Sequence, residues 1–86
     1  MTDYAVTFAR SAEKELADLP VNAVSRARAA INALAVSQRP RGCKKLRNAR
    51  NRWRVRVGDY RIVYTIDDKK RLVDIEAVRH RRFVYR

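Results

Sequence analysis

The feature that most constrains the fold is a pair of alternating runs on either side of a Gly-Asp dipeptide. From Trp53 the sequence reads Trp-Arg-Val-Arg-Val, and after Gly58-Asp59 a run starting at Tyr60 places an apolar residue at every second position. Side chains of a strand alternate between the two faces of a sheet, so both runs are typical of half-buried strands. Gly-Asp suits a two-residue hairpin turn. The sequence therefore predicts a β-hairpin over 53–66.

A two-residue turn also fixes which residues lie opposite each other. The expected pairs are Val57–Tyr60, Arg56–Arg61, Val55–Ile62, Arg54–Val63 and Trp53–Tyr64. The apolar set then shares the core face, while Arg54, Arg56 and Arg61 project together from the other face. Like charges directly opposite each other are destabilising. Three convergent guanidinium groups therefore favour a binding site for an anion, and the planar guanidinium fork suits phosphate. The alternative is an arginine face that is only solvated.

The remaining segments complete an α+β pattern. The expected elements are a strand at 4–8, a helix at 11–19 capped by Ser11, a helix at 22–36, and, after a polar loop at 67–71, a strand at 72–78. Pro20 separates the two helices. We expect a single domain over 1–86, in which an N-terminal strand and a two-helix hairpin pack on one face of a small antiparallel β-sheet.

The positive charge is confined to the second half of the chain. The net charge is +12, yet residues 1–38 hold four basic and four acidic side chains, while residues 39–86 hold 17 basic and five acidic ones. A field of this kind attracts polyanions. Solubility alone does not require such a division, so the sequence favours a nucleic-acid partner.

Further candidate residues flank the hairpin. The basic residues predicted to contact backbone phosphates are Lys44, Lys45, Arg47, Arg50 and Arg52 before it and Arg79 and Arg82 after it. The tail also supplies Arg81, Tyr85 and the single histidine, His80, which can exchange protons near neutral pH. An arginine cannot act as a base, because its pKa lies above ~12. Taken alone, a histidine in a basic tail such as His80 is more often simply solvated than catalytic. A tyrosine near a terminus such as Tyr85 is more often a packing residue.

The sequence offers little to bind a metal or a cofactor. Cys43 is the only cysteine, which excludes an internal disulfide, and the expected arginine face carries no acidic cluster. Cleavage without a metal is easiest on RNA, which carries its own nucleophile in the 2′-OH group. No apolar run is long enough to span a membrane, and the first ten residues lack the pattern of a signal peptide, so we expect a cytoplasmic protein.

Nearly the whole chain resembles the RelE toxins of the RelE/ParE superfamily. The similarity lies in KKLRNARNRWRVRVGDYRIVYTIDD, in LVDIEAVRHRRFVYR and in the opening segment VTFARSAEKELADLP, and its most specific parts are VGDYRIVYTID and HRR-x-VY. The resemblance implies a ribosome-dependent mRNA endoribonuclease that enters the ribosomal A site and is silenced by a cognate antitoxin protein. It implies no small-molecule cofactor, no metal and no membrane.

The resemblance also assigns residues. The basic strand pair falls on Arg54 and Arg56, the arginine of the GDYR motif on Arg61, and the tail pair on Arg81 and Tyr85. Ribonuclease members can have lysines where this chain has Arg54 and Arg56, so proton transfer shifts toward Tyr85, with His80 as a further candidate. Relatives often have glycine where this chain has Arg79.

Two other functions remain open. A ParE-like toxin shares the fold but inhibits DNA gyrase by binding, without nuclease activity. Such chains generally lack the full set of arginines and the tyrosine, which favours the RelE reading. A passive RNA-binding domain would bind mRNA and leave it intact.

Overall fold

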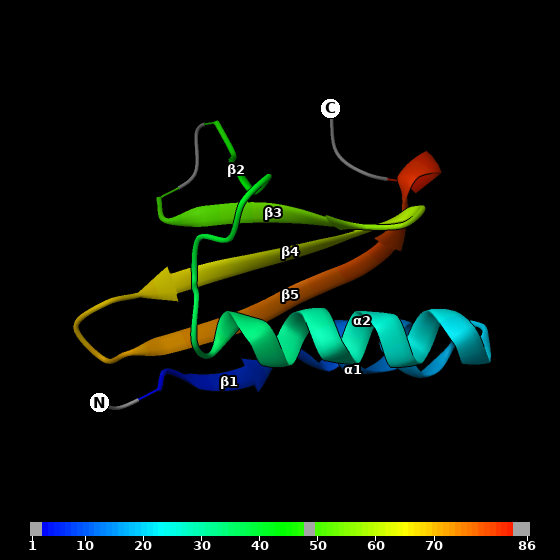
Figure 1. The fold of residues 1–86 in the computed structure, drawn as a ribbon, viewed down its shortest axis with the longest axis horizontal. Coiled ribbons are helices and arrows are strands. Elements are labelled where there is room, and N and C mark those ends of the chain that lie inside the picture. The colour runs from blue at the N-terminus through cyan, green and yellow to red at the C-terminus, as the bar shows by residue number, and fades with distance from the viewer. Residues whose placement is uncertain (1–2, 48–49, 84–86) are drawn as a thin grey trace.

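The computed structural model describes residues 3–47 and 50–83 as one sheet with two helices packed along it (Figure 1). In chain order the elements are β1 (Ala5–Phe8), α1 (Arg10–Ala17), α2 (Val21–Leu34), β2 (Lys44–Lys45), β3 (Arg52–Val57), β4 (Tyr60–Asp67), β5 (Leu72–His80) and the 3₁₀ turn η1 (Arg81–Phe83). No helix in these two ranges is both long and apolar enough to cross a membrane.

The five strands lie in the order β1-β5-β4-β3-β2. The pairs β5–β4, β4–β3 and β3–β2 are antiparallel, and β1 runs parallel to β5 at one edge. A parallel neighbour requires a crossover connection, and the chain between β1 and its partner contains both helices. The expected α+β fold is therefore confirmed, and the sheet is mixed because of this one parallel edge.

The β3–β4 hairpin has the predicted register. All five expected pairs are present, from Val57 opposite Tyr60 to Trp53 opposite Tyr64, and the ladder continues to Arg52 opposite Thr65. Gly58 opens the turn with φ of 59°, a conformation that L side chains rarely adopt. A Cβ atom there would also collide with the guanidinium group of Arg26, which reaches over from α2.

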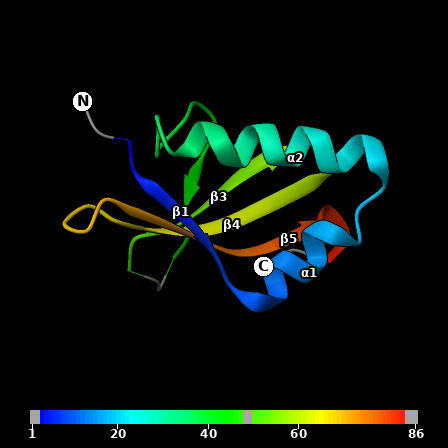
Figure 2. The same ribbon diagram turned by 90° about the horizontal axis from the view of Figure 1, so that it is seen from below.

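The hydrophobic core lies between the sheet and both helices. Its helix members are Ala12 and Leu16 from α1 and Ala27, Ile31 and Leu34 from α2, and its strand members are Ile62, Tyr64, Ile66, Val73, Ile75 and Val78. Figure 2 shows α2 running along the strands, with α1 near the far end of β5. The Tyr64 ring is fully buried, its hydroxyl donates to the Gln38 carbonyl at 2.9 Å, and burial raises its pKa.

One local prediction is wrong, and one strand was not predicted. Ser11 does not cap the first helix, because α1 begins at Arg10 with Ala9 as an N-cap that makes no side-chain hydrogen bond. Strand β2 was not predicted, since a two-residue strand of lysines has no apolar alternation to mark it. It forms because Lys44 and Lys45 pair with Arg54 and Trp53 at the outer edge of β3.

Glu15 of α1 protects the free edge of β5. Strand β1 covers this edge only from Leu72 to Ile75. Beyond that point the Glu15 carboxylate accepts the Val78 backbone N–H at 2.9 Å and the Arg79 Nε–H at 2.9 Å. The side chain thereby satisfies a donor that a neighbouring strand would otherwise bind, and it ties α1 to the sheet.

We expect Glu15→Ala to lower the free energy of unfolding by about 2 kcal/mol, because a charged acceptor and the cover of a strand edge are both lost. Glu15→Gln, which keeps an acceptor for Val78, should cost about half as much. Urea denaturation followed by circular dichroism measures both. The matched control is Glu13→Ala on the same helix, at an exposed position. Equal stabilities for Glu15→Ala and Glu13→Ala would contradict this role.

Candidate nucleic-acid interface

Three arginines converge on the sheet face that the helices leave uncovered. Arg54 and Arg56 alternate along β3, and Arg61 lies directly opposite Arg56 on β4. Together with Lys44 and Gly42 they line one concavity of about 270 Å³. Lys44 joins them because it pairs with Arg54, which places both side chains on the same face of the sheet. The hairpin register thus gathers four cations from three strands around one hollow.

Arg61 lies at the electrostatic centre of this set. Burial lowers the pKa of its guanidinium group, and positive neighbours lower it further. In decreasing order of effect these neighbours are Arg56, Arg54 and Arg81. The carboxylate of Asp59 acts in the opposite direction. Arg61 stays charged, since a guanidinium group begins far above neutral pH, but its charge is crowded and partly desolvated, which strengthens its attraction for an anion.

Two buried apolar residues lie on the sheet next to the arginines. Val63 and Ala77 are 3% and 2% exposed and pair across β4 and β5, yet they lie outside the core beneath the helices. Arg54 lies opposite Val63 and Arg61 is two residues before it on the same strand. The aliphatic parts of such side chains can cover apolar residues while the charged ends stay in water.

Arg81 is the member of the cluster that comes from the tail. It opens η1 directly after β5, and its side chain is 60% exposed. Its Nε lies 4.0 Å from Oδ1 of Asp59, and its charge acts on Arg61. The predicted proximity of the tail to the arginine face is thus present at Arg81. Tyr85, the predicted proton-transfer residue, lies outside the described residues.

His80 lies on the other side of the sheet from the arginines. It pairs with Tyr60, and the two rings meet edge to face at 5.4 Å. It lines a hollow together with Glu15 and Leu19 of the helical layer. Its Nδ1 accepts the Arg82 backbone N–H at 3.2 Å. The structure therefore does not bring His80 into the arginine cluster, although the sequence suggested it as a partner of Tyr85.

The residues predicted to contact phosphates divide into two groups. Arg52 and Arg79 form ion pairs with Glu76 at 2.8 Å and with Glu15 at 2.9 Å. Lys45 is exposed, and its Nζ lies 5.9 Å from the centroid of the Trp53 ring, while the guanidinium carbon of Arg39 lies 5.3 Å from the same centroid. The remaining members are exposed on the surface: Lys44, Arg47, Arg50 and Arg82. Only Lys44 of the whole set lines the arginine concavity.

Sequence reasoning missed the part played by Asp59, which was considered only as a turn residue. Its carboxylate is the negative charge that counteracts the crowding at Arg61. The signal was present in the GDYR segment, where the acid stands two residues before that arginine. Across 3–47 and 50–83, no group of three or more His, Cys, Asp or Glu side chains gathers as a metal site would require.

Comparison with known proteins now identifies the family. Residues 6–85 match the family described as ParE toxin of type II toxin-antitoxin system, parDE. The chain therefore belongs to the RelE/ParE superfamily of toxins of type II toxin–antitoxin systems. A comparison with the curated proteins gave no significant sequence match.

Solved structures of RelE–RelB complexes share the fold. A chain of the RelBE2 toxin–antitoxin complex of Mycobacterium tuberculosis is 30% identical, with a TM-score of 0.80 over 91% of this chain and 98% of that one. A chain of the archaeal RelE–RelB complex of Pyrococcus horikoshii is 27% identical, with a TM-score of 0.83 over 98% and 100%. A chain of the E. coli RelBE complex, at 24% identity, has a TM-score of 0.80 over 96% and 99%, which shows the fold alone.

The repulsion between Arg56 and Arg61 should be measurable. We expect Arg56→Gln to raise the free energy of unfolding by about 0.5 kcal/mol at low ionic strength, because one of two like charges in direct opposition is removed. The gain should vanish in about 0.5 M NaCl, where exposed charges are screened. Paired urea titrations measure it, with Arg28→Gln on the exposed side of α2 as the control. A gain that persists unchanged in salt would rule out repulsion as its cause.

Proposed function

We propose that this toxin is a ribosome-dependent mRNA endoribonuclease that cleaves by attack of the RNA 2′-OH on the adjacent phosphate. The observation that carries the proposal is the convergence of Arg54, Arg56 and Arg61 on one concavity, with Arg81 close enough to act on Arg61. Such a set suits a phosphate that gains negative charge in the transition state. The similarity to RelE chains of known complexes supports the same reading.

The residues take distinct roles in this proposal. RNA supplies the nucleophile, so the protein needs to orient the scissile phosphate and to stabilise charge. Arg54 and Arg56 position the backbone on both sides of the scissile bond. Arg61 binds the phosphate oxygens, and Arg81 stabilises the leaving group. A guanidinium group cannot accept the proton of the 2′-OH, so that role is assigned to the phenolate form of Tyr85, and water protonates the leaving 5′-oxygen.

The partners follow from the same site. The substrate is mRNA in the A site of the ribosome, which places the action in the cytoplasm. The similar chains from M. tuberculosis and P. horikoshii were solved in toxin–antitoxin complexes, and we infer a cognate antitoxin for this toxin as well. The concentration of basic charge predicts an acidic antitoxin segment that covers the arginine face and excludes RNA from it.

The direct test is primer extension on ribosome-bound transcripts after induction of the toxin. We expect new 5′ ends inside codons with the wild-type chain. Arg61→Ala and Arg81→Ala should each reduce cleavage by about 100-fold, because each removes a donor aimed at the reacting phosphate. Arg28→Ala, an exposed arginine of α2, is the matched control and should cleave normally. Cleavage undiminished in both site variants would remove these residues from the site.

The chemistry of the product provides a second test. Attack by the 2′-OH leaves a 2′,3′-cyclic phosphate on the upstream fragment and a 5′-hydroxyl on the downstream one. Toxin pretreated with EDTA and then freed of the chelator should form both ends as fast as untreated toxin, on ribosomes kept in their usual magnesium. A rate that falls after chelation and returns with one added metal, or a 5′-phosphate product, would contradict the mechanism.

A ParE-like gyrase inhibitor is the second candidate, and the family match itself favours it. Such a toxin would need the fold as a binding surface and would not cut RNA. The two functions differ in their products: gyrase-linked DNA breaks mark the inhibitor, and codon-internal mRNA ends mark the ribonuclease. Binding of mRNA with neither product would instead identify a passive RNA-binding domain.

A further inference from the structure

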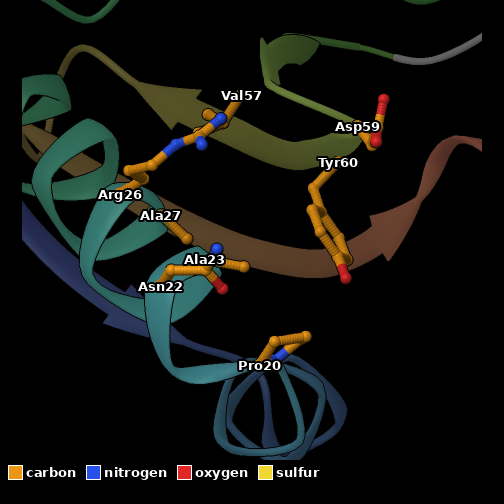
Figure 3. A pocket seen from close by; sticks show the side chains of 8 residues that line it. All are labelled: Pro20, Asn22, Ala23, Arg26, Ala27, Val57, Asp59 and Tyr60. Atoms are coloured by element: carbon orange, nitrogen blue, oxygen red, sulfur yellow. The ribbon is translucent and has the colours of Figure 1, made fainter.

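At the tip of the hairpin, the adjacent side chains of Asp59 and Tyr60 point in opposite directions. Figure 3 shows the Tyr60 ring descending beside a hollow of about 230 Å³ next to α2, while the Asp59 carboxylate points away from it at the rim. The Arg26 guanidinium group lies close to Gly58 on the α2 side of the turn. Asp59 lies on the side of the turn where the chain leaves β5 for the tail.

Asp59 meets Arg81 through both its backbone and its side chain. The Asp59 carbonyl accepts the Arg81 backbone N–H at 2.7 Å, one step beyond the last strand pair, Tyr60–His80. Its carboxylate Oδ1 lies 4.0 Å from Nε of Arg81. The first contact fixes where the tail turns away from the sheet, and the second draws the guanidinium group back toward the hairpin.

The contact between the Asp59 carboxylate and Arg81 matters because of the positive charges around Arg61. Three positive neighbours repel its guanidinium group, and Arg81 is the one attached to a short 3₁₀ turn with a largely exposed side chain. Without a counter-charge, repulsion favours rotamers that carry Arg81 into solvent, away from the cluster. The Asp59 carboxylate provides that counter-charge, because it lies 4.0 Å from Arg81 and its charge also acts on Arg61.

We propose that Asp59 is a positioning residue that holds Arg81 beside Arg61 in the free toxin and releases it to the RNA phosphate on binding. The inference rests on the proposed ribonuclease function, because it assigns Arg81 to the reacting phosphate. The contact is loose and 65% exposed on the Asp59 side, so a phosphate oxygen can replace the carboxylate. Asp59 thus occupies, in the absence of RNA, the place of the anion that Arg81 binds during the reaction.

A charge-neutral variant separates positioning from binding. In Asp59→Asn the turn keeps a residue of the same shape, but the carboxylate charge is lost. We expect the single-turnover cleavage rate on ribosome-bound mRNA to fall about tenfold, because Arg81 is no longer preorganised. The affinity for mRNA with a 2′-deoxy nucleotide at the scissile position should stay equal or tighten, since a repelling charge is removed. Glu13→Gln makes the same charge change on α1 and should alter neither quantity.

Two further measurements decide whether Asp59 acts through Arg81. In an Arg81→Ala background, Asp59→Asn should cause no additional loss of the residual rate. In the free protein, the Nε–H resonance of Arg81 should shift in Asp59→Asn but not in Glu13→Gln. Wild-type cleavage rates in Asp59→Asn, a full tenfold loss in the double variant, or an unshifted Arg81 resonance would overturn the proposal. If the wild-type chain cleaves no mRNA, the ribonuclease proposal fails, while the resonance still tests the contact.

Discussion

The direct opposition of Arg56 and Arg61 is the constraint on which the rest of the site depends. It follows from the two-residue turn at Gly58, and the structure tolerates it because the opposite face of the same strands is buried. Full burial of one large apolar side chain, such as Ile62, contributes about 1.5–3 kcal/mol, whereas a like-charge pair costs about 0.2–1 kcal/mol. Packing therefore decides the register, and the arginines converge as a consequence.

The arginines of this protein fall into two classes, those in ion pairs and those that line the hollow, and their positions in the sheet determine the class. Arg52 and Arg79 lie within 3 Å of carboxylates and tie strands or a helix together. Arg54, Arg56 and Arg61 instead line a hollow together, and the attraction of Arg61 to the Asp59 carboxylate is opposed by repulsion from three cations, Arg56, Arg54 and Arg81. Part of the positive charge is thus held in ion pairs within the protein, whereas Arg54, Arg56 and Arg61 gather around one hollow with Lys44.

The sequence allowed prediction wherever a short-range rule determines geometry. The alternation from Trp53 and the turn at Gly58 gave the hairpin register and the arginine face, because strand periodicity and turn length leave no other choice. Longer-range features carried no such signal. The parallel pairing of β1 with β5 and the position of Glu15 against the edge of β5 depend on how the helices fold back over the sheet. Strand β2 was missed because two lysines carry no apolar alternation.

His80 illustrates the limit at the site itself. Its place in a basic tail suggested that it accompanies Arg81, but β5 continues to residue 80, and so strand alternation directs the imidazole to the helix side. Extending the predicted strand by two residues would have shown this. Asp59 was missed because it lies in a turn, where strand alternation does not predict the direction of a side chain. Its neighbour Arg81 becomes known only once the segment after β5 has been placed beside the turn.

Fold similarity alone leaves the choice between the two toxin activities open, since a ribonuclease and a gyrase inhibitor can share a scaffold. The electrostatic repulsion on the uncovered sheet face favours the ribonuclease that we propose over a surface that only binds. A surface that only binds another macromolecule gains from dispersed charges, because dispersed charges attract a partner without repelling each other. Crowding Arg54, Arg56 and Arg81 around Arg61 is unfavourable in the free protein, because burial and repulsion disfavour the charged form and lower the pKa of Arg61. A concentrated negative charge at the centre would offset this cost. In the reaction that we propose, the scissile phosphate would supply this charge, since it gains negative charge in the transition state.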